Sequence, residues 1–332
     1  MLKKLLKLNK FYYKDFVFTE KNDFLNIFIN LFFLIKIFLY FIQRKLIQFN
    51  VFLKNIFYSH KNYFLNIKKS NDEVCYIVGG GPSLKNLKLN SLSGKSLFTT
   101  SFFHKHSFCN EKSPEYYCFL DPLMFNPYEF KKQKNYNQIE EMIINTAKDI
   151  KSKTSNSTYV FPYSKSNFKA IKELNLFPQE KVKFIKMSSF DISSYIPSNL
   201  SLKSGLPFSF NVLPWIICIA ILKGYKKIYL IACEQDLYLN SYDSFKSKEI
   251  IFDRKKVENP DYNIKDFEIE NLSKKLHPFC SNYISTFLTN HILGAHLNLE
   301  LFAKQKGVKI IDTTKNGLLD MYEKIEVEKI TD

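Results

Sequence analysis

A run of three glycines is the feature of this sequence best suited to binding a ligand. It directly follows the apolar, β-favouring residues 74–78. The turn comprises Gly79, Gly80, Gly81, Pro82 and Ser83. Bare backbone amides at the end of a buried parallel strand can bind an anionic group, most simply a nucleotide phosphate. A tight turn without any ligand has the same residues, so the run alone does not establish a binding site.

Polar side chains also lie near the ends of the other apolar, strand-like segments or directly after them. They are Thr100, Ser101, Asp121, Glu234, Gln235, Asp236, Tyr238 and Tyr242, and His277 lies in a loop ahead of the last predicted helix. Taken singly, each has an ordinary explanation. Asp121 and Pro122 are typical of a turn, and His104 and His106 resemble paired structural histidines more than catalysts. Because the carboxyl ends of parallel strands meet at one edge of a sheet, we expect these residues to converge on one site.

For these residues to converge on one site, the chain must form a parallel sheet whose strands alternate with helices. Strands are expected at 73–78, 97–103, 116–120, 159–161, 182–186, 227–233 and 308–311, and helices at 139–148, 207–222 and 284–306. Gly224 and Gly307 follow two of these helices at positions typical of a helix C-cap. The alternation predicts an α/β fold with a Rossmann-like, mostly parallel sheet and flanking helices.

Charge and cysteine content narrow the function classes. The 332 residues are 45% hydrophobic and carry a formal net charge of +16, with the lysines spread along the chain. The excess of positive charge favours an anionic partner such as a nucleotide or a membrane surface. An overall compositional drift toward Lys, Asn, Phe, Ile and Tyr nevertheless explains much of this charge. None of the six cysteines forms a C-x-x-C pair or has a metal-like spacing to histidine. This indicates a reducing compartment, no disulfide framework and no metal site.

Residues 1–72 differ from the rest and are expected to form an apolar, helical N-terminal segment ahead of a catalytic domain at 73–332. Residues 1–70 contain no glycine or proline, and residues 24–42 are apolar except for Asn26, Asn30 and Lys36. Three interpretations remain: a helix on the membrane surface, a soluble helix packed on the domain or on a second copy of the chain, and a membrane span. The first implies a cytoplasmic protein peripheral to the inner membrane, and assembly as a homo-oligomer stays open.

Several stretches of the sequence, in this order, resemble a known family. They are residues 79–84 (Gly-Gly-Gly-Pro-Ser-Leu), 119–125 (Phe-Leu-Asp-Pro-Leu-Met-Phe), 204–205 (Ser-Gly), 224–230 and 236–238 (Asp-Leu-Tyr). Over about residues 73–325 the chain is similar to the bacterial lipooligosaccharide sialyltransferases. It is also similar to related proteins with a domain of the 6-hydroxymethylpterin pyrophosphokinase or motility accessory factor type. Residues 1–70 have no counterpart in those sialyltransferases.

The resemblance implies a glycosyltransferase of bacterial surface-glycan (lipopolysaccharide) biosynthesis with a GT-A-like, nucleotide-sugar-binding domain. Such an enzyme transfers a nonulosonic acid, such as sialic acid, from a CMP-activated donor. The acceptor is a hydroxyl of a saccharide or a lipid-linked glycan, and transfer proceeds with inversion and without a metal or a further cofactor. Nucleic acid is not among the partners that the resemblance implies.

The resemblance also implies functions for individual residues. Those expected to bind the donor are Gly79, Gly80, Gly81, Pro82, Ser83, Thr100, Ser101, Asp121, Ser204, Gly205 and Asp236. Tyr238 and Tyr242 match a tyrosine pair whose hydroxyls stabilise charge on the leaving phosphate. For the base that takes the acceptor's proton, His277 is the favoured match and His291 is the alternative.

Two departures from the family pattern leave other functions open. Gly80 and Asp121 stand where the sialyltransferases carry asparagine, and a carboxylate beside an anionic donor is unfavourable without a cation or a proton. One alternative is a pyrophosphokinase-like enzyme that binds ATP and Mg²⁺ through carboxylates such as Asp121 and Asp236. The other is a non-enzymatic basic protein of the membrane surface or of nucleic acid, which requires lysines and aromatic residues gathered on one face.

Overall fold

The computed structural model describes residues 23–57, 72–87, 89, 92, 95–100, 102–111, 113–235, 278–314 and 317–331. By its contacts the chain divides into two compact units, Met1–Phe49 and Asn50–Asp332. The larger unit contains the whole sheet, and the smaller contains most of helix α2 (Asp23–Phe57).

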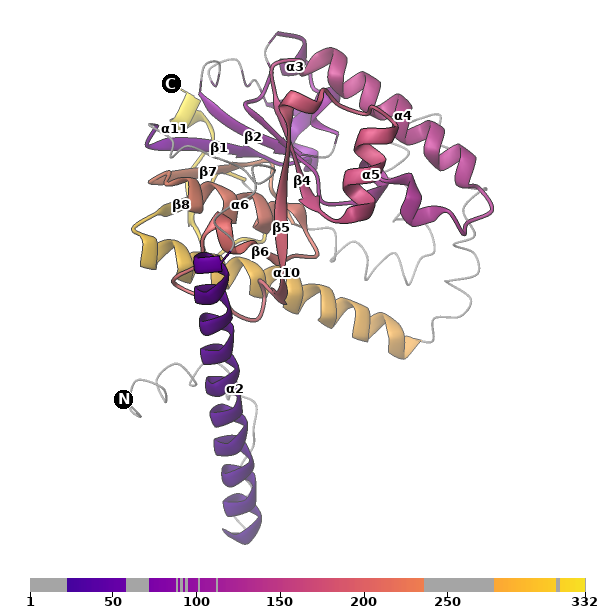
Figure 1. The fold of residues 1–332 in the computed structure, drawn as a ribbon. Helices are drawn as coiled ribbons and strands as arrows, with labels where there is room; N and C mark the ends of the chain where they lie inside the picture. The colour runs from indigo at the N-terminus through magenta and orange to yellow at the C-terminus, as the bar shows by residue number, and fades with distance from the viewer. Residues whose placement is uncertain are drawn as a thin grey trace. The chain divides into compact units, whose positions relative to one another are not determined.

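Nine parallel strands form one sheet among the described residues (Figure 1). In spatial order they are β6 (Leu206–Phe208), β5 (Val182–Asp191), β4 (Thr158–Tyr163), β3 (Tyr116–Cys118), β2 (Ser96–Thr100), β1 (Val74–Val78), β7 (Lys227–Ile231), β8 (Lys309–Asp312) and β9 (Glu323–Lys324). Every pair of neighbouring strands is parallel. The predicted α/β fold with a Rossmann-like sheet and flanking helices is confirmed.

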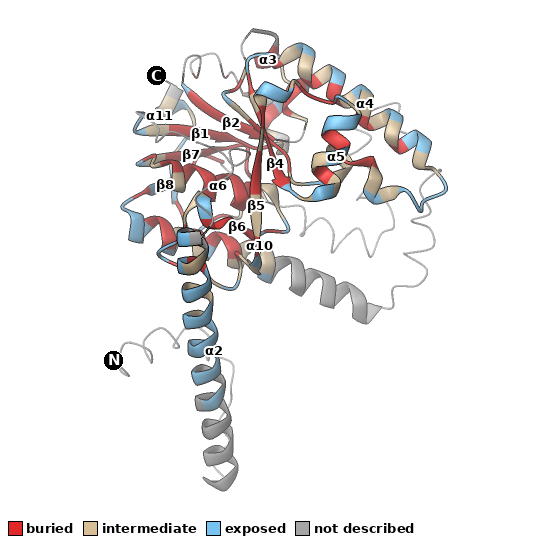
Figure 2. Ribbon diagram, viewed as in Figure 1, coloured by how far each residue is buried: buried red, intermediate tan, exposed pale blue. Residues whose placement is uncertain are grey.

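Helices cover both faces of the sheet, over two separate apolar cores. They are α3 (Phe108–Glu111), α4 (Tyr136–Lys153), α5 (Lys165–Glu173), α6 (Val212–Lys223), α10 (Pro278–Lys306) and α11 (Glu328–Thr331). Because side chains alternate along a strand, Cys75 and Ile77 of β1 join the core beneath α6 and α10, whereas Tyr76 and Val78 join the core beneath α4 and α5. Figure 2 shows the strands buried between these layers. Burial on both faces explains why the strands are nearly continuous apolar runs.

Helix α6 is apolar on all sides and lies almost entirely inside the first core. Trp215 near its start is fully buried. The Asn211 side chain caps the helix by accepting a hydrogen bond from the Leu213 amide at 2.8 Å. Gly224 ends it in the left-handed conformation, with φ of 94°, as the sequence predicts. The helix therefore begins at a fixed point just beyond the carboxyl end of β6.

Two elements differ from the expected ones near this point. Strand β5 continues beyond residue 186 to Asp191, because its second half pairs with β6 instead of β4. The apolar stretch 207–222 is not one helix but contains the end of β6, a turn and α6. The Ser209 hydroxyl stabilises that turn by donating to the carbonyl oxygen of Asn211 at 2.6 Å.

Helix α2 confirms that the N-terminal segment is helical over 35 residues. Among its described side chains, the exposed large apolar ones are Ile35, Phe38, Leu39, Tyr40, Phe41, Ile42, Leu46, Phe49, Phe52 and Ile56. In the part of the chain that the structure describes, no helix combines the length and apolar character needed to cross a bilayer. Contact with a membrane surface stays a prediction.

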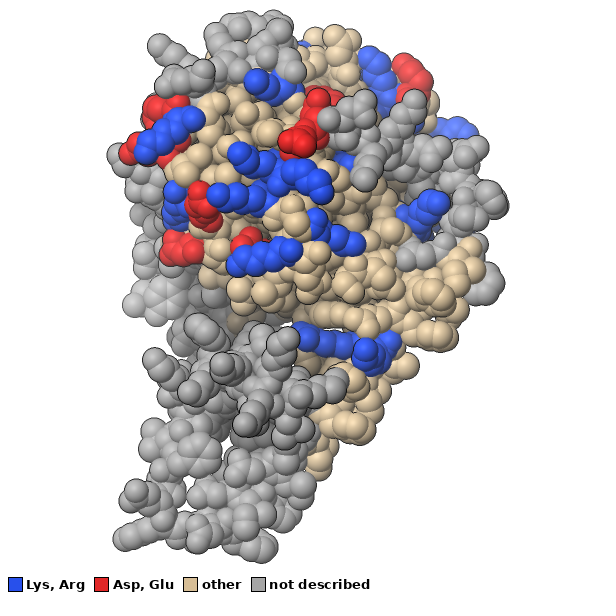
Figure 3. All heavy atoms as spheres, turned by 90° about the vertical axis from the view of Figure 1, so that its left-hand side faces the viewer, with Lys and Arg blue, Asp and Glu red and all other residues tan. Residues whose placement is uncertain are grey.

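Charged side chains of both signs share the face drawn in Figure 3. Lys and Arg predominate there, and Asp and Glu lie among them. At the β8–β9 edge, Lys309 pairs with Glu323 at 2.6 Å and Lys324 pairs with Asp320 at 2.7 Å. The non-enzymatic alternative predicts lysines and aromatic residues gathered on one face. On the face drawn in Figure 3, acidic side chains lie among the basic ones.

A buried histidine in α10 gives the fold a pH-dependent stability. His296 is fully buried against Tyr322, with 2.9 Å between its Nδ1 and the phenolic oxygen, and burial lowers its pKa to about 3. Below pH 6.5 the unfolded chain binds a proton at this residue that the folded chain does not bind. Stability is therefore lost as the pH falls from about 6.5 toward 3, by about 2 kcal/mol at pH 5.

Urea unfolding at pH 7 and pH 5 measures this loss. In His296→Gln the free energy of unfolding should differ between the two pH values by about 2 kcal/mol less than it does in the unchanged protein. An equal pH difference in the variant would show that other groups cause the acid sensitivity.

Candidate active site

The order of the strands reverses between β1 and β7. Strands β2 to β6 continue outward from β1, whereas β8 and β9 lie beyond β7. At such a switch point the loops that leave the two central strands diverge, and ligands of open α/β sheets bind in the crevice between them. The glycine turn after β1 and the segment after β7 meet at this place.

The glycine turn is packed tightly against the end of β7. The Gly79 amide donates to the carbonyl oxygen of Ile231 at 2.8 Å, and the Gly81 amide donates to that of Ala232 at 3.0 Å. A Cβ atom at Gly79 would overlap the Ala232 carbonyl oxygen. Two of the amides that the sequence suggests as bare anion donors thus already bind the chain itself. The glycines are needed here for the close approach of two backbones.

Glu234, the third residue after β7, lies against the same turn. Its Oε1 accepts a hydrogen bond from the Ser83 amide at 2.8 Å, and a Cβ atom at Gly81 would overlap its Oε2. The side chain is 7% exposed, and both Oε2 and the Ser83 hydroxyl are buried with no hydrogen-bond partner among the described residues. A carboxylate at this position disfavours a phosphate and favours a group that donates hydrogen bonds.

A second buried carboxylate lies at the end of the neighbouring strand β8. Burial raises the pKa of Asp312, and the nearby Glu234 carboxylate raises it further, against hydrogen bonds from Thr314 that lower it. Its Oδ1 accepts from the Thr314 amide at 3.0 Å, while Oδ2 is buried without a partner. Burial also raises the pKa of the adjacent Cys233 thiol well above its usual value, so this cysteine is not a nucleophile.

An Asp–His pair lies at the end of β5. The Nδ1 atom of His291, on α10, is 2.7 Å from Oδ2 of Asp191, and the hydroxyl of Ser193 is 3.0 Å from the same nitrogen. The Ser193 amide donates to Oδ1 of Asp191 at 2.8 Å, which fixes the carboxylate. A proton on Nδ1 satisfies this arrangement, which fixes the orientation of the ring. The two side chains are 24% and 19% exposed, so small molecules can reach the pair.

Two contacts connect this Asp–His pair to the loop after β7. The His291 ring lies 4.7 Å from the ring of Phe210, and the next residue is Asn211, the cap of α6. The Asn211 side-chain amide donates to Oε1 of Gln235 at 3.1 Å. Gln235 directly follows Glu234, and its φ of 54° turns the chain sharply. The Asp–His pair and the switch point therefore belong to one continuous edge of the sheet.

Other predicted site residues have local structural explanations. Asp121 is exposed and accepts from the Leu123 amide at 3.0 Å, as a turn residue does. Thr100 is buried at the end of β2. Ser204 forms a capping box with Ser201. Gly205 has φ of 86°, and a Cβ there would lie 2.8 Å from the Lys186 carbonyl oxygen, so this position requires glycine.

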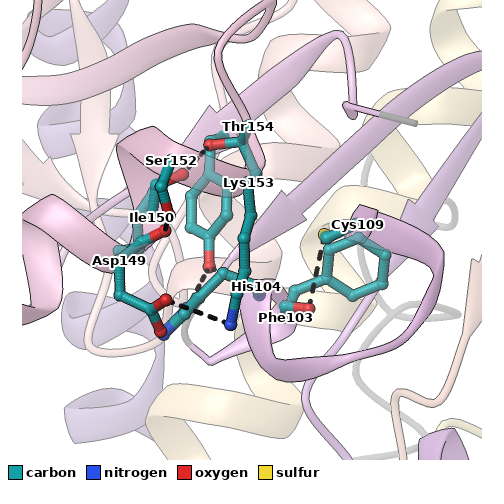
Figure 4. A network of polar contacts seen from close by, with 9 residues as sticks. Phe103, His104, Cys109, Asp149, Ile150, Ser152, Lys153 and Thr154 are labelled. Carbon is teal, nitrogen blue, oxygen red and sulfur yellow. Dashed lines mark hydrogen bonds and ion pairs between the residues drawn. The ribbon is translucent and has the colours of Figure 1, made fainter. Parts of the chain in front are cut away.

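The two histidines after β2 have structural partners. His104 is buried, with its Nε2 3.3 Å from Asp149 and its Nδ1 3.1 Å from the Tyr117 hydroxyl. Figure 4 shows His104 and Lys153 both directed at the Asp149 carboxylate. His106 accepts from the Phe108 amide at 3.2 Å. The interpretation of both as structural residues is confirmed.

The remaining predictions fall largely outside the described residues. Ser101, Asp236, Tyr238, Tyr242 and His277 all lie there. Gly80 and Pro82 are described as part of the turn, and Pro82 begins a short 3₁₀ helix. Within the described ranges, no group of three or more His, Cys, Asp or Glu side chains could hold a metal ion.

Asp191, Ser193 and Asn211 have weaker signals in the sequence than the predicted site residues have. Asp191 and Asn211 are each two residues before a backbone amide that they bind, a local pattern typical of turns and caps. The sequence also indicates His291 as a candidate base. It is less favoured there than His277, because His291 lies within a predicted helix and His277 in a loop.

Comparisons with family models, with curated proteins and with solved structures found no match to this chain. The residues and their geometry are accordingly the basis for assigning a function.

Proposed function

We propose that this chain is a glycosyltransferase that moves a sugar from a nucleotide-activated donor to a hydroxyl of a saccharide acceptor. The observation that carries the proposal is the Asp191–His291 pair at the carboxyl edge of the sheet, with 2.7 Å between Oδ2 and Nδ1. A sugar hydroxyl becomes nucleophilic only as it loses its proton, and an imidazole oriented by a carboxylate is suited to take that proton.

In this reaction Nε2 of His291 accepts the proton of the acceptor hydroxyl. The acceptor oxygen bonds to the anomeric carbon as the bond from that carbon to the phosphate oxygen breaks, and the leaving nucleotide keeps the electron pair. Asp191 stabilises the imidazolium that forms. We assign the donation of hydrogen bonds to the leaving phosphate to Tyr238 and Tyr242, on the family resemblance. His277 is the second candidate for the base on the same ground.

The chemistry around the glycine turn limits how the donor is oriented. Oε2 of Glu234 and the hydroxyl of Ser83 are buried beside the turn, and the described part of the chain provides no hydrogen-bond partner for either atom. We therefore infer that a hydroxyl or amino group of the donor, as on a ribose or a cytosine, lies beside the turn, and that the phosphate lies farther along the edge. A CMP-activated nonulosonic acid, the donor that the resemblance implies, has both kinds of group.

One observation favours a second candidate function. Glu234 and Asp312 each retain a buried carboxylate oxygen without a partner near the switch point. Two carboxylates together with substrate phosphates are a common way of binding Mg²⁺ in kinases. A pyrophosphokinase-like enzyme that uses ATP and Mg²⁺ is thus the alternative.

Thermal unfolding with added nucleotides distinguishes the two functions. A ligand present at about one hundred times its Kd raises the free energy of unfolding by about 2.7 kcal/mol, which raises Tm by roughly 5 °C for a domain of this size. We expect CMP to raise Tm with or without Mg²⁺, and ATP with Mg²⁺ to leave it unchanged. Stabilisation by ATP only with Mg²⁺ would establish the kinase alternative. If neither CMP, CDP, UDP, GDP nor ATP changes Tm, both enzymatic proposals fail.

A further inference from the structure

Two phenylalanines beside the Asp–His pair point out of the protein. Phe208, the last residue of β6, is 42% exposed, and Phe210 is 48% exposed. Their ring centroids are 4.7 Å apart and the rings are nearly perpendicular. Phe210 is also 4.7 Å from the His291 ring. Large aromatic side chains that remain accessible next to a histidine suggest a binding surface more than a packing function.

The backbone that carries these rings is held firmly. The Phe208 carbonyl oxygen accepts a hydrogen bond from the Ile192 amide at 2.9 Å, next to Asp191. Pro207 and Ser209 are buried, so these two residues point into the protein while Phe208 and Phe210, which alternate with them, point outward. The segment that carries the two rings is thus hydrogen-bonded to the segment that carries Asp191.

We propose that Phe208 and Phe210 bind the apolar face of the acceptor sugar and so form the acceptor subsite. A pyranose ring has a face of C–H groups, which is attracted to the negative face of an aromatic ring, and a rim of hydroxyls. A sugar on Phe210 places its rim against the adjoining His291 ring, where a hydroxyl can give up its proton. Ser193 and Asn211 lie next to His291 and Phe210 and can bind further hydroxyls.

This inference rests on the proposed function, because an acceptor sugar has to bind beside the Asp–His pair only if His291 is the base that takes its proton. A nucleobase also stacks on aromatic rings, but the proposed function places the nucleoside of the donor, through its ribose or its base, beside Glu234 and Ser83 at the glycine turn. The contact of Phe210 with the proposed base therefore favours the acceptor over the donor.

Saturation-transfer NMR on the full chain tests the subsite directly, with methyl β-D-galactopyranoside as the probe. We expect saturation of the ring C–H protons of one sugar face. In Phe208→Leu and Phe210→Leu this signal should fall roughly fivefold or more, because leucine retains apolar bulk but not the aromatic face. Phe52→Leu is the matched control, since Phe52 is 50% exposed on α2. The Tm of each variant shows whether it is folded.

Three results would overturn the subsite. They are the absence of saturation with the unchanged protein, equal saturation in folded Phe208→Leu and Phe210→Leu variants, and loss of CMP binding instead of sugar binding. Release of CMP from CMP-N-acetylneuraminic acid, with lactose present, separates this question from the proposed function. Transfer with an unchanged acceptor KM in both variants refutes the subsite alone, whereas sugar binding without any transfer refutes the function alone.

Discussion

His291→Ala is expected to lower the rate of sugar transfer by about 10²- to 10⁴-fold, the usual contribution of a general base. The residues that we propose to bind the nucleotide of the donor lie elsewhere on the edge of the sheet, so the Kd of CMP should stay near that of the unchanged protein. Release of CMP from the donor in the presence of an acceptor gives kcat and KM, and calorimetry gives Kd.

Asp191 is expected to act through His291 as a positioning residue. In Asp191→Asn the carboxylate that holds Nδ1 at 2.7 Å becomes an amide, so kcat should fall by roughly 10- to 100-fold while the acceptor KM changes little. Asp191→Glu retains the charge and should recover part of the rate. A merely structural aspartate would instead lower Tm, with kcat per folded molecule unchanged.

His277→Ala belongs in the same experiment, because the sequence favours this residue as the base. Full activity of His277→Ala and loss in His291→Ala would assign the base to His291. The reverse result would restore His277 and leave the Asp191–His291 pair as a structural contact.

The fold could be predicted from the sequence because its signals are local. A strand buried on both faces is a short apolar run, and the helices between such runs end at Gly224 and Gly307, both with positive φ. The end of β5 was missed because it depends on a partner. Residues 187–191 are strand only because β6 lies beside them.

The site was predictable only in outline, because its contacts join residues far apart in sequence. Nothing near His291 indicates that Asp191 will lie 2.7 Å away from it. The expectation of bare amides in the glycine turn failed for the same reason, since their acceptors are Ile231 and Ala232, which lie on or just after the neighbouring strand β7 but far along the chain. A local pattern can suggest an anion site, but only the tertiary partners decide which charge the turn accepts.

Gly79→Ala is expected to destabilise the protein by about 3 kcal/mol, through overpacking and a strained or broken hydrogen bond. The new Cβ would overlap the Ala232 carbonyl oxygen, which is backbone and cannot rotate away. Strands β1 and β7 would have to separate where the Gly79 amide binds Ile231 at 2.8 Å. Thermal unfolding should show a fall in Tm of roughly 6–10 °C.

Gly294→Ala is the matched control, because it adds the same methyl group where there is room for it. In α10 the nearest atoms to the new Cβ would be in Ser193, at 3.7 Å, an ordinary contact distance. Helix propensity then favours alanine by about 1 kcal/mol, so Tm should rise or stay the same. Equal effects of the two substitutions would mean that the glycine turn is not tightly packed against β7. Its amides would then be available to an anion, and the orientation proposed for the donor would have to be reversed.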